Sequence, residues 1–363
     1  MNPNKIRVFL VDDSPTVRMI LKDLLGACPD IEIAGEASNG LDAVERVGLF
    51  NPDIVVMDVQ MPVLNGFEAT EQIMAHSPKP ILILSSIVNR TEVFTSMRAI
   101  ELGALDVMEK PEFADEKKVE EFAAKLLEKI RILSRIQVIT HIRGRHAARG
   151  KEAERVEPSP PVKPEIPVFP AGPIDIVAIG ASTGGPLALK ILLSGLSPSF
   201  DTPIVIVQHI TNGFMDGMAG WLHSECKRRI IVAGDRQSLE RGCVYFVPNG
   251  AQPSFAARGI LVLDRAMNAR GGFKPSADVL FESVAAYYGP RSLGILLTGM
   301  GEDGARGLLK LRTEKGMTVA QDRFSSIVYG MPRAAAELGA AVHILPIHQV
   351  AEFMNNLNRK NNP

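Results

Sequence analysis

The sequence predicts an α/β protein built from two doubly wound, mostly parallel sheets that are joined by a linker. Short apolar runs alternate with amphipathic segments along most of the 363 residues. A stretch rich in proline and charge interrupts this alternation over residues 135–172. The chain is also long for one domain and comfortable for two. We therefore expect one domain over residues 1–134 and a second domain over residues 173–357.

Apolar runs and helical segments alternate strictly in the first domain. The runs predict strands at residues 6–12, 31–37, 53–58, 80–86 and 106–110. The intervening segments predict helices at residues 14–28, 41–50, 66–76, 90–103 and 116–134. Ser14 is suited to cap the first helix and Pro15 to begin it. Because sequential β–α–β units are right-handed, we expect helices on both faces of a parallel sheet.

Composition and charge exclude several classes of protein. The formal net charge of −1 gives no general attraction to nucleic acid or to a membrane surface. Residues 143–151 are basic but lack interleaved aromatic residues, so we interpret them as part of a solvated linker. No apolar run is long enough to cross a membrane, and the N-terminus does not resemble a signal peptide. Three scattered cysteines indicate reduced thiols, so we expect a cytoplasmic protein. We also expect the protein to be a monomer.

Polar side chains end four predicted strands of the first domain. Asp12 and Asp13 end the first strand, and Asp58 ends the third. Parallel strands end at the same edge, so these carboxylates should converge and suit a hard cation such as Mg²⁺. Ser85 and Lys110 end the fourth and fifth strands, where they could hold the oxygens of a phosphoryl group on Asp58. Phosphorylation would add negative charge at this edge.

These residues lie in motifs that resemble response-regulator receiver domains. The motifs are VDDSPTVR, MDVQMPVLNG, LSS and EKP, and the resemblance covers residues 1 to about 125. It implies a flavodoxin-like (βα)5 fold with Asp58 as phosphoacceptor and a histidine kinase as phosphodonor. It also implies that Asp12, Asp13 and Asp58 hold Mg²⁺, while Ser85 and Lys110 sense the phosphoryl group. Val107 departs from the pattern, because many receivers have an aromatic residue there.

The second domain opens with the sequence GASTGGP between a predicted strand and a predicted helix. The glycine spacing does not match a dinucleotide-binding loop, and the acid expected after the next strand is absent. A simple tight turn with a capping serine is a second interpretation. The third, which we favour, is a nucleophile turn of the G-x-S-x-G type that exposes Ser182. The following helix N-terminus would place a positive dipole end beside that serine.

A serine nucleophile needs a base within hydrogen-bond reach. Of the seven histidines, only His209 directly follows a predicted buried strand beside that of the nucleophile, the run TPIVIVQ. We therefore expect it to lie on the strand next to that of Ser182. Asp303, in a glycine-rich loop after another apolar run, is our candidate for the acid that orients His209. Glu302 competes with it, and Asp264 and Asp278 are weaker choices.

The set IGASTGG, VQHI and LTGMGEDGA resembles the protein-glutamate methylesterase domain of bacterial chemotaxis. The chain order Ser, His, Asp differs from that of the α/β-hydrolase fold. The resemblance implies that Ser182 is the nucleophile, His209 the base and Asp303 its orienting acid. It further implies an oxyanion donor at the Met300 backbone, with Thr183 shaping the site. The implied fold is a Rossmann-like α/β sheet, and the implied substrates are glutamate methyl esters and glutamines of chemoreceptors.

Two other functions remain open at this point. The second domain could bind a partner or a nucleotide without catalysis, or it could be an esterase for a small metabolite. A DNA-binding output is disfavoured, because the region has neither a basic stripe nor a helix-turn-helix pattern. We expect no cofactor in the second domain. We also hypothesise that the unphosphorylated receiver covers the active-site edge, since one tether joins a switch to an enzyme.

Overall fold

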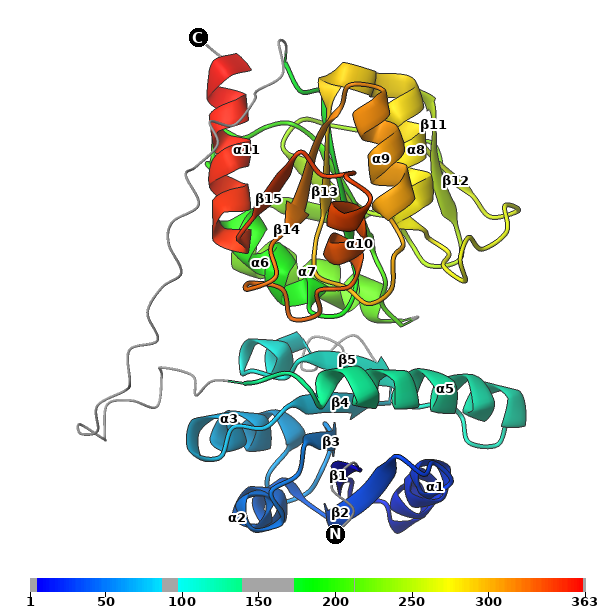
Figure 1. The fold of residues 1–363 in the computed structure, drawn as a ribbon, viewed down its shortest axis with the longest axis vertical. Helices are drawn as coiled ribbons and strands as arrows, with labels where there is room; N and C mark the ends of the chain where they lie inside the picture. Colours follow the sequence, from blue (N-terminus) through cyan, green and yellow to red (C-terminus); the bar gives the residue numbers. More distant parts are fainter. Residues whose placement is uncertain (1–4, 87–96, 139–172, 212, 362–363) are drawn as a thin grey trace, which may run out of the picture.

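The computed structural model describes residues 5–86, 97–138, 173–211 and 213–361. It contains two α/β bodies, one from the first half of the chain and one from the second, stacked along the longest axis (Figure 1). The linker expected at residues 135–172 lies mostly outside the described residues. No helix among the described residues is long and apolar enough to span a bilayer.

A five-stranded parallel sheet forms the N-terminal domain, with strand order β2-β1-β3-β4-β5. Its strands are β1 (Ile6–Val11), β2 (Ile31–Ala37), β3 (Ile54–Asp58), β4 (Ile81–Ser85) and β5 (Asp106–Glu109). Its helices are α1 (Pro15–Gly26), α2 (Gly40–Phe50), α3 (Gly66–His76) and α5 (Glu116–Leu133). Most of the helix predicted at residues 90–103 lies outside the described residues, although 97–101 are helical. The expected alternation of strands and helices is confirmed.

Local sequence signals explain where these helices begin. The Ser14 side chain accepts a hydrogen bond from the amide of Val17, and Pro15 follows it as the first residue of α1. At α3, Asn65 and Glu68 form a reciprocal capping box. Both helices therefore start directly after the loops that leave β1 and β3, so these loops are short and fixed at the acidic edge.

A seven-stranded parallel sheet forms the C-terminal domain, with strand order β15-β14-β13-β6-β7-β10-β8. Its strands are β6 (Ile176–Ala181), β7 (Ile204–Gln208), β8 (Arg229–Val232), β10 (Cys243–Phe246), β13 (Ser292–Leu296), β14 (Met317–Gln321) and β15 (His343–Leu345). The helices are α6 (Gly185–Ser194), α7 (Phe214–Cys226), α8 (Ala277–Tyr288), α9 (Ala305–Thr313), α10 (Met331–Glu337) and α11 (Ile347–Asn361), with a 3₁₀ turn at Gly289–Arg291. The predicted doubly wound α/β class is confirmed for both domains.

The sequence analysis missed a small antiparallel sheet in the C-terminal domain. It consists of β9 (Gln237–Ser238), β11 (Gln252–Ala257) and β12 (Ile260–Asp264), in the order β11-β12-β9. β9 and β11 lack the continuous apolar runs that identify buried parallel strands. β12 has such a run, but only alternate side chains of it are buried. The sheet packs against α8 at the side of the domain (Figure 1).

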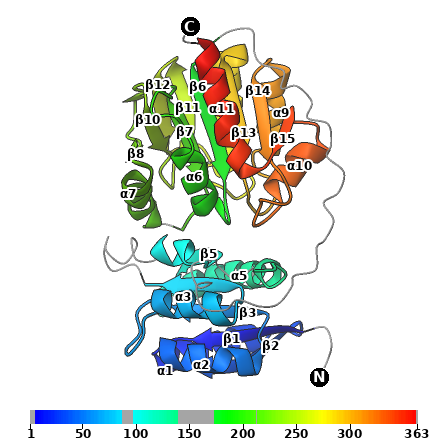
Figure 2. The ribbon, with the colours of Figure 1, turned by 90° about the vertical axis from the view of Figure 1, so that its left-hand side faces the viewer.

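Strands β13, β6 and β7 lie side by side in the middle of the larger sheet. In register, Leu296 pairs with Gly180, and Ala181 pairs with Gln208. The three strands therefore end at nearly the same level, and the loops that follow them share one edge. In Figures 1 and 2 this edge faces the N-terminal domain, with β5 and α5 nearest to it.

Candidate active site and acidic site

Ser182 lies on the tight turn between β6 and α6, as predicted. Its amide donates to the Thr298 carbonyl at 3.0 Å. Its own carbonyl accepts from the Gly185 amide and from Nε2 of Gln208, each at 2.8 Å. Gly184 has a φ of 78°, a left-handed conformation that favours glycine. These contacts fix the turn while the Ser182 side chain faces a cavity of about 450 Å³.

Gly299 brings the loop after β13 directly against this turn. A Cβ atom added to Gly299 would lie 2.2 Å from Sδ of Met331 and 2.8 Å from Cβ of Ser182. A residue without a side chain is therefore required for the two loops to approach this closely.

His209 follows β7 at the same edge, and its amide donates to the Ala181 carbonyl at 2.9 Å. Nε2 of its ring lies 2.9 Å from Oδ2 of Asp303, an ion-pair distance. This contact meets the distance for an ion pair but not the full geometry of a hydrogen bond, and neither ring nitrogen has a hydrogen-bond partner within the described part of the chain. Nδ1 is therefore unpaired among the described residues, and Ser182 and His209 line one cavity.

Asp303 is buried at the N-terminus of α8. Oδ1 accepts from the Ser276 hydroxyl, and Oδ2 accepts from the Ala277 amide, each at 2.7 Å. Burial by itself would raise the pKa of Asp303, but the contact with His209 and these two hydrogen bonds outweigh it and lower the pKa. The carboxylate is thus held in its charged form beside the imidazole.

The three competing acids lie elsewhere. Glu302 is exposed and pairs with Arg306. Asp264 accepts from the amides of the turn that follows it. Asp278 accepts from the Gly307 amide at 2.6 Å, and burial raises its pKa. Of the four carboxylates, the structure brings Asp303 to His209.

Thr183 and Met300, predicted to support the site, both line the same cavity. The Thr183 carbonyl accepts from the Thr298 hydroxyl at 3.0 Å, which links the loops after β6 and β13. The Thr183 hydroxyl lies 3.4 Å from Nζ of Lys129, a residue of α5 in the N-terminal domain. Lys129 in turn pairs with Asp106 of β5.

The N-terminal domain therefore forms part of the cavity wall. Besides the residues just named, the lining side chains from this domain are Val107, Lys125 and Glu128. An apolar cluster around α5 continues into Met300, Ile327 and Val328 of the C-terminal domain. A second contact joins the domains at Lys190 of α6, which pairs with Glu101 and also with Glu225.

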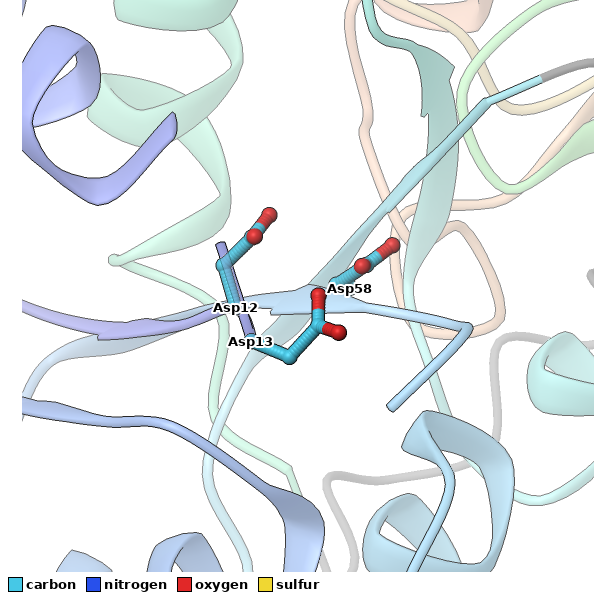
Figure 3. A group of neighbouring side chains, drawn as sticks. All are labelled: Asp12, Asp13 and Asp58. Atoms are coloured by element: carbon cyan, nitrogen blue, oxygen red, sulfur yellow. The ribbon is translucent and has the colours of Figure 1, made fainter. Parts of the chain in front are cut away.

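The acidic residues of the N-terminal domain converge as predicted. One carboxylate oxygen from each of Asp12, Asp13 and Asp58 lies within 4.8 Å of the others (Figure 3). Nζ of Lys110 lies 2.6 Å from Asp12 and 2.9 Å from Asp58. Burial raises the pKa of Asp58 to about 6, an effect that Lys110 opposes and Asp12 increases. The single positive charge of Lys110 does not balance three converging carboxylates. Their hard oxygen atoms therefore fit a divalent cation.

Ser85 ends β4 at the same edge and is buried. Ser86 and Gln60 line the cavity above the acids, and the sequence analysis named neither of them. It also missed Ser276, which donates to Asp303, and Phe273, whose ring stacks on that of His209. Both follow β12 in a segment without a strong apolar pattern, and no local motif relates either residue to a histidine far away in sequence.

Comparison with known proteins finds a matching family for each of the two domains. A family model described as CheB methylesterase matches residues 177–354, and one described as response regulator receiver domain matches residues 8–121. The chain is 37% identical to protein-glutamate methylesterase/protein-glutamine glutaminase 4 of Geobacter metallireducens, over 97% of this chain and 99% of that protein. The chain belongs to this family. The family expected from the sequence motifs is therefore confirmed.

Two further similarities extend over one or both domains. A Methanospirillum hungatei protein-glutamate methylesterase/protein-glutamine glutaminase is 38% identical over 98% of this chain and 99% of its own length. The crystal structure of the Thermotoga maritima CheB methylesterase catalytic domain covers 51% of this chain and 98% of that chain, with 32% identity and a TM-score of 0.49.

Proposed function

We propose that this chain hydrolyses glutamate γ-methyl esters of chemoreceptors and deamidates selected glutamines, in the service of sensory adaptation and under control of phosphorylation. Its relatives are named for both reactions over nearly the full length of the chain. The observation that carries the proposal is the 2.9 Å contact between His209 and Asp303, at the rim of a cavity that Ser182 also lines.

The reaction begins when Oγ of Ser182 attacks the ester carbonyl and passes its proton to Nδ1 of His209. The tetrahedral intermediate collapses, and methanol leaves with that proton, so that an acyl-enzyme remains. Water then attacks the acyl carbon while His209 accepts its proton, and His209 returns that proton to Oγ of Ser182 as the glutamate carboxylate is released. With glutamine, the same path expels ammonia. Asp303 keeps the proton on Nε2 and stabilises the charged imidazole.

Two further residues support this chemistry. The Met300 amide, in the loop beside Ser182, would donate to the developing oxyanion. Thr183 would fix the wall next to the nucleophile through its contact with Thr298. The first residue of α6 is Gly185, so the positive end of that helix also lies close to the reacting carbonyl.

Loss of methanol release in a serine variant tests the catalytic half. We expect Ser182→Ala to lower the rate at which the phosphorylated chain releases methanol from a methylated chemoreceptor by a factor on the order of 10⁶. Ser199→Ala, an exposed serine of the same domain, is the matched control and should keep the wild-type rate. Wild-type methanol release from Ser182→Ala would contradict the proposal.

We propose Asp58 as the phosphoacceptor, with a chemotaxis histidine kinase as donor. Asp12, Asp13 and Asp58 would hold Mg²⁺, which offsets the charge of the incoming phosphoryl group when it is bound. Lys110 already contacts two of these carboxylates and would pair with the phosphoryl oxygens, and Ser85 would read them from β4. Mg²⁺ would suit this edge because the three aspartates offer only carboxylate oxygens as ligands.

We further propose that the unphosphorylated N-terminal domain restrains the enzyme. Lys129 contacts Thr183, the residue after the nucleophile, and β5 and α5 supply part of the cavity wall. A receptor helix that reaches Ser182 would have to displace these elements. Because the acidic edge and β5 belong to one sheet, a charge change at Asp58 can act on this contact.

An asparagine at the phosphoacceptor tests the switch. We expect Asp58→Asn to retain basal methanol release and to lose all stimulation by acetyl phosphate with Mg²⁺. Asp53→Asn, on the same domain before β3, is the control and should be stimulated like the wild type. Full stimulation of Asp58→Asn would place the phosphoacceptor elsewhere.

A further inference from the structure

The ring of Phe273 lies flat against the imidazole of His209. The ring centroids are 4.0 Å apart, and the ring planes differ by 8°. Face contact leaves the edge of the imidazole open, so Nε2 still lies 2.9 Å from Oδ2 of Asp303, in a ring that lines the same cavity as Ser182. From this contact we propose that Phe273 is a positioning residue, which holds the plane of His209 between Ser182 and Asp303 and stabilises its charged form.

The backbone at Phe273 is set by a tight turn. The amides and carbonyls of Arg270 and Phe273 bond to each other in both directions, each at 2.9 Å. Between them, Gly271 and Gly272 have φ angles of 58° and 86°. Two successive left-handed residues are the signature of a type I′ hairpin turn, which glycine adopts without strain. The aromatic side chain therefore leaves a well-defined backbone position.

A buried amide ties this turn to the support of Asp303. Nε2 of Gln252 donates to the Phe273 carbonyl at 3.0 Å, and its Oε1 accepts from the Ser276 amide at 2.9 Å. The Ser276 hydroxyl donates to Asp303. Gln252 is fully buried, so these bonds are costly to break. One side chain thus links the residue stacked on His209 to the residue that holds its carboxylate partner.

A second anchor acts at the other side of the turn. The Arg270 guanidinium forms two hydrogen bonds with the Glu282 carboxylate on α8, at 2.6 and 2.7 Å. Such bidentate pairs fix direction as well as distance. The turn is therefore held to α8 as well as to β11, and the Phe273 ring has little freedom to swing away from His209.

Stacking should matter most when the imidazole is charged. In the proposed reaction His209 is neutral before attack and cationic in the transition state, and the negative face of an aromatic ring attracts a cation. An interaction that strengthens in the transition state changes kcat rather than KM. Aromatic contacts of this kind correspond to about a three- to tenfold rate effect.

The test compares Phe273→Leu with Phe273→Tyr in the full chain, activated with acetyl phosphate and Mg²⁺. Methanol release from a methylated chemoreceptor should show kcat lowered about three- to tenfold in Phe273→Leu, with KM unchanged. Phe273→Tyr keeps the ring and should restore most of the rate. Phe255→Leu, which removes a buried aromatic residue from β11, is the control and should keep the wild-type kcat. Thermal unfolding checks that each variant is folded.

Three results would overturn the inference: a wild-type kcat in Phe273→Leu, an equal loss in Phe273→Tyr, or an equal loss in Phe255→Leu. The inference rests on the proposed function, so Ser182→Ala is measured in parallel. If Ser182→Ala is inactive and Phe273→Leu is unaffected, only the role of Phe273 fails. If Ser182→Ala is fully active, the proposed mechanism fails instead.

A second readout does not depend on the receptor substrate. A fluorophosphonate labels Ser182 in a reaction that needs His209 as base. The labelling rate should therefore fall in Phe273→Leu and recover in Phe273→Tyr. Equal labelling rates in all three proteins would contradict the proposal. Absence of labelling in the wild type would contradict both the nucleophile and the positioning residue.

Discussion

At the scale of single residues, two carboxylates buried near the N-terminus of α8, those of Asp303 and Asp278, have pKa values shifted in opposite directions. Asp303 contacts His209 and accepts hydrogen bonds from Ser276 and Ala277, which together lower its pKa against the effect of burial. Asp278 is dominated by burial, so its pKa is raised although Gly307 donates to it. The surroundings therefore stabilise the charged form of one acid and disfavour that of the other.

This contrast predicts opposite changes in stability with pH. A lowered pKa adds stability above the unfolded value of 3.8 that is lost as pH falls through the folded value, so Asp303→Asn should destabilise the chain at pH 7 by about 1–3 kcal/mol. A raised pKa costs stability at neutral pH, so Asp278→Asn should stabilise it there. Both differences should vanish well below pH 3.8 in urea unfolding. Changes in unfolding free energy of the same sign for the two variants at pH 7 would contradict the opposite pKa shifts of Asp303 and Asp278.

At the scale of elements, the site depends on three neighbouring strands that end at one level. The loops after β6, β7 and β13 carry Ser182, His209 and Asp303 respectively. Their mutual approach requires Gly299, where an added Cβ would meet both Ser182 and Met331. Close packing of loops, rather than the strands alone, sets the distance between the reacting groups.

An alanine at this contact should damage activity more than stability. We expect Gly299→Ala to cost about 1–3 kcal/mol of unfolding free energy through overpacking. Methanol release should fall on the order of 100-fold, because Ser182 is displaced. Gly220→Ala, in α7 with open space around it, is the control and should slightly stabilise the chain without loss of activity. Wild-type activity in Gly299→Ala would show that the loop adjusts freely.

At the scale of the whole molecule, two polar contacts between described residues join the N-terminal domain to the C-terminal domain. Lys129 reaches Thr183, and Glu101 pairs with Lys190 of α6. Lys190 also pairs with Glu225 on its own domain, so it keeps a partner if the domains separate. A contact that is weak by itself can still restrain the enzyme, because the linker keeps the domains close together.

Removal of the charge at the interface should therefore raise basal activity. We expect Glu101→Gln to increase methanol release by the unphosphorylated chain about two- to fivefold, the range typical of one partly exposed ion pair. Added salt should produce the same increase in the wild type and little further change in the variant. Glu314→Gln, which breaks the pair between Lys310 of α9 and the residue that caps this helix, is the control and should leave the basal rate unchanged. A basal rate that stays at the wild-type level would contradict this role of Glu101.

The sequence by itself determined the fold class and the family, and it predicted several polar residues at the strand ends. Continuous apolar runs identified the buried parallel strands, and polar residues placed directly after them had to meet at one edge. Ser182, His209, Asp12 and Asp58 could be found in this way because each lies within one residue of a strand end.

Only the tertiary structure decided which acid meets His209, and it alone revealed Phe273, Ser276 and the particular residues of the N-terminal domain that line the cavity. Asp303 lies seven residues past the end of β13, so the path of its loop, rather than the strand, decides where the carboxylate goes. Stacking and domain contacts join residues far apart in the chain, and their geometry arises from packing, which no local pattern encodes.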